Sequence, residues 1–299
     1  MQHILQVRPD EQMQAGICAS ASAAPRRSCG GDFTAIAVSE VESCELARLV
    51  ASPERILSDP TATVVKRGRS ALVVRVELSI GGNETPAAYK RCGSRTWLRR
   101  IARGVRTPAA LRNFELGHRL IRLGIATPRP LVAVAPRWHN LLKPSFLATQ
   151  WIDDAMPFDA FARAASDWAP DRRRAALCEA ARKFGRLIGT LHKHGFSHRD
   201  LKSGNLLVRD KKGHVEVFLV DLDGASRPRL RIPATRLKNL ARLHAASRQL
   251  MGVTHSIRCR FVQSYLATLR GHADWKAVWR HLQRTSKISP RLRHPRTTS

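Results

Sequence analysis

The sequence predicts an α+β fold of two lobes, a small lobe built on an antiparallel sheet followed by a mostly helical lobe. Short β-branched segments separated by turn residues dominate between residues 63 and 151, whereas segments with helical periodicity dominate between residues 170 and 284. A chain of 299 residues has room for a domain of roughly 230 residues with tails. We expect a flexible leader over residues 1–50, the first lobe over 51–152, the second over 153–285 and a basic tail over 286–299.

In the first lobe, β-branched segments lie on either side of a Gly/Asn cluster at residues 81–84, which predicts a hairpin. The expected strands are 63–67, 71–79, 86–91, 130–135 and 145–151, with a helix over 108–123. One segment of the leader, 41–50, also has helical character. The connection 151–154 is expected to be a hinge whose backbone groups bind adenine. Alternatively, Asp153 and Asp154 cap a turn there.

The second lobe begins with a long predicted helix over 170–194, which has Pro170 near its start and Gly195 after its end. Its apolar positions recur at helical spacing and predict one buried face: Ala176, Leu177, Ala180, Phe184, Leu187, Ile188 and Leu191. A hairpin follows, with strands 206–208 and 215–220. The remaining expected helices are 233–250, 256–269 and 272–284.

One motif in this lobe indicates chemistry. Residues 198–205 read His-Arg-Asp-Leu-Lys-Ser-Gly-Asn and match every defined position of the kinase catalytic loop, and an apolar strand further on ends at Asp221. Phosphoryl transfer requires an oriented hydroxyl and neutralised phosphate oxygens. Asp200 would accept or orient the hydroxyl proton, and Asn205 and Asp221 would supply oxygen ligands to Mg²⁺. Lys202 would reach the transferring phosphate. A surface turn and an unrelated strand end are the alternative, which the joint order of the motifs disfavours.

The same pattern requires a lysine on the third strand of the first lobe, paired with a glutamate on the following helix. Lys90 has the expected strand position, and Glu115 is the one acid between residues 91 and 137. The alternative for Glu115 is a solvated helix carboxylate. For the ATP phosphates the sequence offers only a glycine-poor loop, where amides near Gly68 and Ser70 would act with Lys66 or Arg69.

Several segments outside these motifs carry a resemblance. They are the Arg-rich stretch after Lys90, the Thr-Pro-Arg-Pro connection within 123–131, the Asp-x-Asp form at Asp221 and Asp223, and residues 236–243 and 260–266. From about residue 61 to 269 the chain resembles the lipopolysaccharide kinase family, the bacterial Kdo and heptose kinases with a protein-kinase-like fold.

This resemblance implies ATP-dependent phosphorylation of an inner-core sugar of lipopolysaccharide at the cytoplasmic membrane face. It assigns functional positions to Lys90, Asp200, Asn205 and Asp221. Asp223 replaces the usual glycine of protein kinases, as either a second metal contact or a helix cap. The implied partners are ATP, Mg²⁺ and a lipopolysaccharide core or lipid A precursor.

Charge also bears on the partners. The formal net charge is +29, and such a field attracts anionic partners, including the anionic surface of the inner membrane. A GC-rich genome is an alternative explanation for the excess of Arg over Lys. Six cysteines without a C-x-x-C pair and no apolar run long enough to span a bilayer predict a cytoplasmic protein, peripheral at the inner face of the inner membrane. No nucleic acid is expected, because no RNA or DNA motif is present.

Two other functions remain open from the sequence. The first is an atypical Ser/Thr protein kinase, although few residues separate Asp223 from the helix near 232 and no Ala-Pro-Glu follows. The second is a non-catalytic basic pseudokinase or nucleic-acid-binding module, which the intact motif residues disfavour. His192, His194 and His198 do not suggest a metal site, because they straddle a helix end and a turn.

Overall fold

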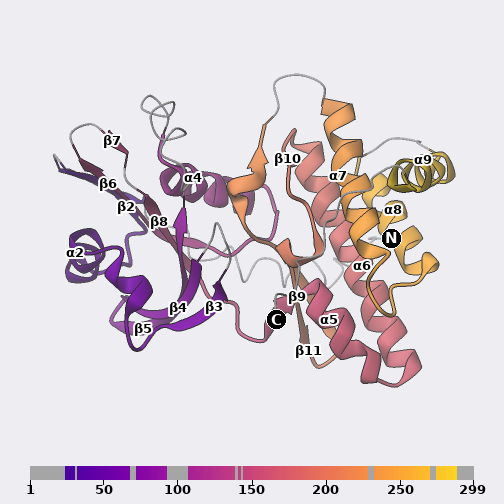
Figure 1. Cartoon of the computed structure of the whole chain (residues 1–299), viewed down its shortest axis with the longest axis horizontal. Helices are drawn as coiled ribbons and strands as arrows, with labels where there is room; N and C mark the ends of the chain where they lie inside the picture. The colour runs from indigo at the N-terminus through magenta and orange to yellow at the C-terminus, as the bar shows by residue number, and fades with distance from the viewer. Residues whose placement is uncertain are drawn as a thin grey trace, which may run out of the picture. The chain divides into compact units, whose positions relative to one another are not determined.

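The computed structural model describes residues 24–30, 32–67, 72–92, 107–138, 141–142, 144–227, 232–269 and 274–287 (Figure 1). These residues divide into two compact units. The first contains the described residues up to Arg122 together with Pro128–Trp151, and the second contains Leu123–Thr127 and the described residues from Ile152 onward.

The first unit is built on one antiparallel sheet with the strand order β1-β2-β6-β8-β5-β4-β3, and β7 pairs with β6. The strands are β1 (Arg26–Gly30), β2 (Phe33–Ala37), β3 (Thr63–Arg67), β4 (Leu72–Ile80), β5 (Asn83–Cys92), β6 (Pro130–Trp138), β7 (Leu141–Leu142) and β8 (Ser145–Gln150). The strands predicted between residues 63 and 151 are confirmed, and the tight turn of the β4–β5 hairpin falls at Gly81 and Gly82, both with positive φ.

The expectation of a flexible leader over residues 1–50 is wrong for residues 33–50. Strand β2 pairs with β6 along its whole length, and Ala35 and Ala37 are inaccessible to solvent. Helix α2 (Ser43–Ala51) follows and buries Leu49, as the helical character of 41–50 indicated. The segment is rich in small residues, as linkers are. It is nevertheless buried, because it pairs with a strand about a hundred residues further along the chain. Local composition does not reveal such pairing.

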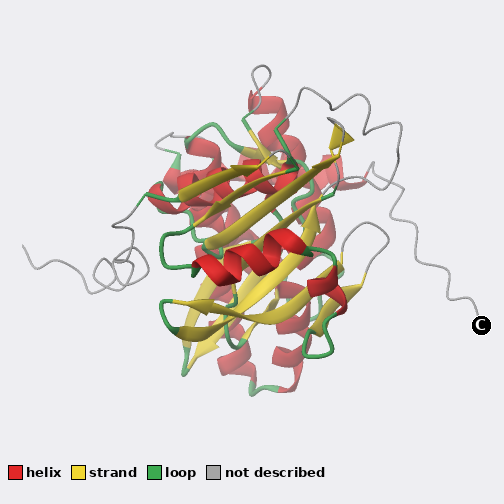
Figure 2. Ribbon diagram, turned by 90° about the vertical axis from the view of Figure 1, so that its left-hand side faces the viewer, coloured by secondary structure: helices red, strands yellow, loops and turns green. Residues whose placement is uncertain are grey.

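The remaining helices of the first unit are η1 (Arg55–Ser58) and α4 (Ala109–Arg122), which packs on β6 and β8. Helix α2, at the left of Figure 1, is the helix that lies in front of the strands in Figure 2. The largest fully buried side chains in this core include Tyr89 and Phe146, whose rings stack with centroids 5.9 Å apart. The Tyr89 hydroxyl donates to the Pro53 carbonyl at 3.0 Å, and burial raises the pKa of Tyr89.

The second unit is mostly helical. Its helices are α5 (Phe158–Ala164), η2 (Ala165–Asp167), α6 (Pro170–Lys193), η3 (Ser203–Asn205), η4 (Leu222–Gly224), α7 (Ile232–Ser247), α8 (His255–Thr268) and α9 (Trp275–Lys287). Its strands are β9 (Ala155–Pro157), β10 (Ser197–His198), β11 (Leu206–Lys211), β12 (His214–Leu219) and β13 (Ala225–Ser226). The sheet order is β12-β11-β9, and β10 pairs with β13. The predicted long helix, hairpin and three C-terminal helices are confirmed, whereas α5 and β9 were not anticipated.

Helices α6 and α8 form the densest contact in this unit, and two glycines permit it. A Cβ at Gly185 would lie 2.5 Å from the Phe261 carbonyl oxygen, and a Cβ at Gly189 would lie 2.9 Å from the Tyr265 carbonyl oxygen. The two glycines are four residues apart and therefore share one face of α6. The predicted buried face of α6 is confirmed, because all seven of its members are buried: Ala176, Leu177, Ala180, Phe184, Leu187, Ile188 and Leu191.

Candidate active site

The two motif segments predicted from the sequence meet in the second unit. Helix α6 ends at Lys193, and Gly195, with a φ of 79°, lets the chain reverse. The chain then enters β10, which pairs with β13 just beyond the metal motif. The Arg199 amide also donates to the Gly224 carbonyl at 2.9 Å. The catalytic loop and the loop carrying Asp221 are therefore joined through their backbones.

Asp200 and Lys202 form an ion pair on the accessible side of this loop. The Lys202 Nζ donates to Asp200 Oδ2 at 2.7 Å, and the side chains are 49% and 55% exposed, respectively. An ion pair so exposed contributes little to stability. Its position instead leaves a carboxylate and an ammonium open to an incoming substrate, as the proposed roles of these two residues require.

Asn205 is held from three directions. Its Nδ2 donates to the Asp200 carbonyl at 2.8 Å, its backbone amide donates to the Lys202 carbonyl at 3.0 Å, and its own carbonyl accepts from the Val220 amide at 3.0 Å. The side chain is only 1% exposed, and within the described part of the chain its Oδ1 has no hydrogen-bond partner. A buried amide oxygen without a partner is costly unless another group satisfies it.

Asp221 follows β12 directly in a left-handed conformation, with a φ of 63° and a ψ of 57°. A non-glycine residue adopts this conformation at a cost and only where its surroundings hold it there. Its carbonyl contacts His198 Nε2 at 3.0 Å, and His198 is completely buried, which lowers its pKa. His198 thus ties the strand before Asp200 to the residue that carries the second predicted metal ligand.

These residues fit a magnesium ion. Among the described residues Asn205 Oδ1 has no partner, and it and the Asp221 carboxylate are the hard oxygen ligands that Mg²⁺ prefers. Asn205 lies in the catalytic loop, and His198 ties Asp221 to it. When bound, such an ion neutralises charge on phosphate oxygens. Gly224, which follows Asp223, lies close against His198, because a Cβ at Gly224 would lie 2.7 Å from His198 Cε1.

Of the four site residues predicted in the first unit, three lie among the described residues. Lys90 is half-buried on β5, where it pairs with Val73 of β4 and Leu147 of β8. Glu115 is exposed on α4, and Lys66 is exposed on β3 beside an irregularity in its register. Gly68 lies outside the described residues. The pairing of Lys90 with Glu115 and the phosphate contacts of Lys66 and Gly68 stay predictions.

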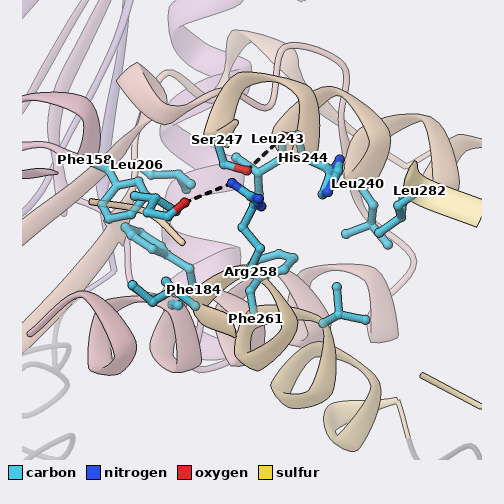
Figure 3. Close-up of a pocket in the computed structure, with 14 residues that line it drawn as sticks. Phe158, Phe184, Leu206, Leu240, Leu243, His244, Ser247, Arg258, Phe261 and Leu282 are labelled. Atoms are coloured by element: carbon cyan, nitrogen blue, oxygen red, sulfur yellow. Dashed lines mark hydrogen bonds between the residues drawn. The ribbon is translucent and has the colours of Figure 1, made fainter. Parts of the chain in front are cut away.

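An apolar pocket lies among the helices of the second unit, apart from the catalytic loop (Figure 3). Asp200, Asn205 and Asp221 do not line it. Arg258 donates to the Val253 carbonyl at 2.9 Å, but within the described residues its Nε and both ring nitrogens of His244 have no hydrogen-bond partner. Burial lowers the pKa of the Arg258 guanidinium. The remaining lining is mainly aliphatic and aromatic, as in a helix-packing core: Phe158, Phe184, Leu206, Leu240, Leu243, Phe261 and Leu282.

Comparison with known proteins decides the family. The model of the lipopolysaccharide kinase (Kdo/WaaP) family matches residues 89–280, which include the catalytic loop and both predicted metal ligands. The chain belongs to this family.

Two relatives and one solved structure show how far the likeness extends. A 3-deoxy-D-manno-octulosonic acid kinase of Xanthomonas campestris pv. campestris (strain B100) is 32% identical over 176 residues, which are 57% of this chain and 64% of the relative. A kinase of the same name from Xylella fastidiosa (strain 9a5c) is 31% identical over 188 residues, 61% of this chain and 68% of the relative. The matched part thus spans a little less than two thirds of the Xanthomonas protein.

The structure of WaaP in complex with acyl carrier protein matches with a TM-score of 0.54 at 19% identity, covering 83% of this chain and 97% of that one. At this identity the match establishes the fold, and the predicted two-lobed, protein-kinase-like α+β fold is confirmed. Among the helices that the structure describes, none has both the length and the hydropathy of a membrane span.

Proposed function

We propose that this chain is an ATP-dependent kinase that transfers the terminal phosphate to a hydroxyl of a lipopolysaccharide inner-core sugar, Kdo or heptose. The observation that carries the proposal is the arrangement around Asn205. One loop carries an accessible carboxylate at Asp200 and a buried Asn205 amide oxygen that has no partner among the residues the structure describes, and His198 ties that loop to Asp221.

The chemistry divides among these residues. Asp200 would orient the acceptor hydroxyl and take up its proton, and Lys202, already 2.7 Å from Asp200, would stabilise charge on the transferring phosphate. Asn205 and Asp221 would hold Mg²⁺. In the first unit, Lys90 would contact the phosphates of ATP, with Glu115 as its ion-pair partner. Lys66 and the backbone amides near Gly68 would also bind the ATP phosphates.

Kdo is the acceptor we favour. The relatives from Xanthomonas and Xylella are named as kinases of 3-deoxy-D-manno-octulosonic acid, a sugar acid. A carboxylate-bearing acceptor suits a chain with a net charge of +29, because complementary charge raises the association rate and discriminates against neutral sugars. Heptose remains the second acceptor.

The basic surface of the second unit supports a location at an anionic membrane face, peripheral and cytoplasmic, where a lipopolysaccharide core or lipid A precursor is found. Exposed cations gather on α8 and α9: Arg260, Lys276, Arg280 and Arg284. Each cation close to an anionic leaflet contributes about 1 kcal/mol. Replacement of Arg280 and Arg284 by Glu should therefore weaken binding to anionic vesicles and leave binding to neutral vesicles unchanged.

Deletion of the gene tests the proposal in the cell. Mass spectrometry of the lipopolysaccharide core should show the loss of one phosphate, which wild type restores and Asp200→Ala does not. Asp171→Ala is the matched control, because Asp171 is an exposed carboxylate in the first turn of α6, outside the catalytic loop. If deletion leaves the mass of the lipopolysaccharide core unchanged, the proposal is wrong. If deletion instead removes a phosphate from a protein, the chain is a protein kinase.

A further inference from the structure

The Thr-Pro-Arg-Pro connection carries part of the family resemblance but has no role in the chemistry described above. Within it, Pro128 and Pro130 flank Arg129, and neither proline can donate a backbone hydrogen bond. The pairing of β6 with β8 is irregular where β6 begins, with a register shift between Pro130 and Val132. The backbone ladder is therefore weak at this point, and side chains are needed to hold the chain in place.

Arg129 is anchored by a residue from much earlier in the chain. Its Nη2 donates to Glu40 Oε1 at 2.5 Å, and the two side chains are 26% and 33% exposed, respectively. The Ser39 hydroxyl donates to the other carboxylate oxygen of Glu40 at 2.9 Å. Burial alone would raise the pKa of Glu40, but the hydrogen bonds from Arg129 and Ser39 lower it overall. The carboxylate therefore stays charged at neutral pH, and its bond to Arg129 is a charge-assisted one.

The backbone around Glu40 is fixed on both sides. The Val38 amide donates to the Leu131 carbonyl at 2.9 Å, and the Glu40 carbonyl accepts from the Gly81 amide at 2.8 Å. Glu40 is thus held between β6 and the turn of the β4–β5 hairpin. It lies outside residues 89–280, which the family model matches, whereas Arg129 lies inside them. The anchor therefore comes from a part of the chain that the family model does not describe.

Arg129 and the residue after it contact two parts of the first unit that have proposed roles in ATP binding. The Arg129 carbonyl accepts from the amide of Gln150, which ends β8 directly before the expected adenine-binding hinge, at 2.8 Å. The Pro130 carbonyl accepts from His118 Nε2 at 3.0 Å. His118 lies three residues after Glu115 on α4, and so on the same side of that helix. Residues 129 and 130 therefore join the end of β8 to α4.

We propose that Glu40 and Arg129 are positioning residues for ATP binding, a role that rests on the proposed kinase function. The ion pair holds the start of β6, and the Arg129 carbonyl in turn holds Gln150. The next amide, of Trp151, donates to the Pro86 carbonyl at 3.0 Å. These two bonds set the direction in which the chain leaves β8 and enters the hinge. Loss of the ion pair displaces the backbone groups that would bind adenine, and affinity for the nucleotide falls.

Calorimetry with Mg-ATP, without an acceptor, measures this effect. In Glu40→Ala we expect the Kd for Mg-ATP to rise about 3- to 10-fold, whereas kcat at saturating ATP stays within about twofold of wild type. Glu40→Gln keeps an oxygen that can accept from Arg129 and should restore the affinity to within about twofold. Glu179→Ala is the matched control and should leave the Kd unchanged. Its ion pair with Arg182 is also 2.5 Å long and similarly exposed, but lies within α6.

Hydrogen exchange without nucleotide, followed by mass spectrometry, separates this proposal from the proposed function. The backbone amides of residues 148–151 should exchange about 3- to 10-fold faster in Glu40→Ala, but not in Glu40→Gln or Glu179→Ala. If Glu40→Ala does not fold, Arg129→Met removes the same ion pair from its other side. An unchanged Kd or unchanged exchange in the folded variant would overturn the proposal. Wild type that binds no Mg-ATP would instead overturn the proposed function, and with it any role of the ion pair in ATP binding.

Discussion

The catalytic loop and the β3 edge of the sheet serve the same proposed reaction but are built in opposite ways. The loop is held by buried hydrogen bonds to His198, Asn205 and Asn239, and its exposed residues are Arg199, Asp200 and Lys202. Lys66 instead lies on a fully exposed edge strand. The difference indicates that the loop acts on the acceptor hydroxyl through exact geometry. Strand β3 instead supplies positive charge to the ATP phosphates without exact placement.

The largest effect should come from the loop itself. Asp200→Ala removes the group that accepts the hydroxyl proton and should lower kcat by roughly 10²- to 10⁴-fold. Nucleotide affinity, measured by calorimetry with Mg-ATP, should change less than about threefold, because the proposed metal ligands stay in place. Wild-type kcat in this variant would show that Asp200 has no part in catalysis.

The helix packing that supports the loop gives the next effect. In Gly189→Ala the new Cβ would meet the Tyr265 carbonyl and the Thr268 side chain, at 2.9 and 2.7 Å in the present backbone. Urea unfolding should show a loss of about 3 kcal/mol, the upper end for an overpacked site. Gly204→Ala is the control, since nothing lies within 4 Å of a Cβ there. Equal stability of the two variants would mean that α6 and α8 are not closely packed at Gly189.

Acid should weaken the same region through His192. Burial lowers its pKa from 6.5 to about 4, so in this range of pH the unfolded chain binds a proton that the folded chain does not. The contribution of His192 is complete above pH 6.5 and is lost as the pH falls toward 4, by about 2 to 3 kcal/mol at about pH 4.5.

The free energy of unfolding measured against pH tests this. His192→Gln should flatten the acid side of the curve relative to wild type, although His244, whose pKa is also lowered to about 4, keeps part of the slope. A slope that does not change in His192→Gln would place the titration elsewhere.

The smallest effect is expected at the β3 edge. Lys66→Ala removes one exposed cation and should raise the KM for ATP by about twofold to fivefold, with kcat unchanged. The effect should shrink at high salt, because exposed charges are screened. A large fall in kcat would mean that Lys66, like the catalytic loop, acts through exact geometry, and would place it at the reacting phosphate.

The sequence predicted the parts that local rules determine. The catalytic motif has a fixed order of residues from His198 to Asn205, and helix α6 has a regular apolar face. Both could therefore be predicted from the sequence, together with the residues that α6 buries. Strand β2 was missed because its partner β6 lies a hundred residues away. The contact of Asn239 with the His198 amide was missed because a buried side chain bonded to a backbone amide has no signature in sequence spacing, although the segment around it was noticed.

The most direct measurement is transfer of radiolabelled phosphate from Mg-ATP by the purified chain, offered lipopolysaccharide core from a strain that lacks the gene. Wild type and Asp171→Ala should label the saccharide, and Asp200→Ala should not. Label on protein alone, or no label with any of the three, would contradict the assignment of this chain as a kinase of the lipopolysaccharide core.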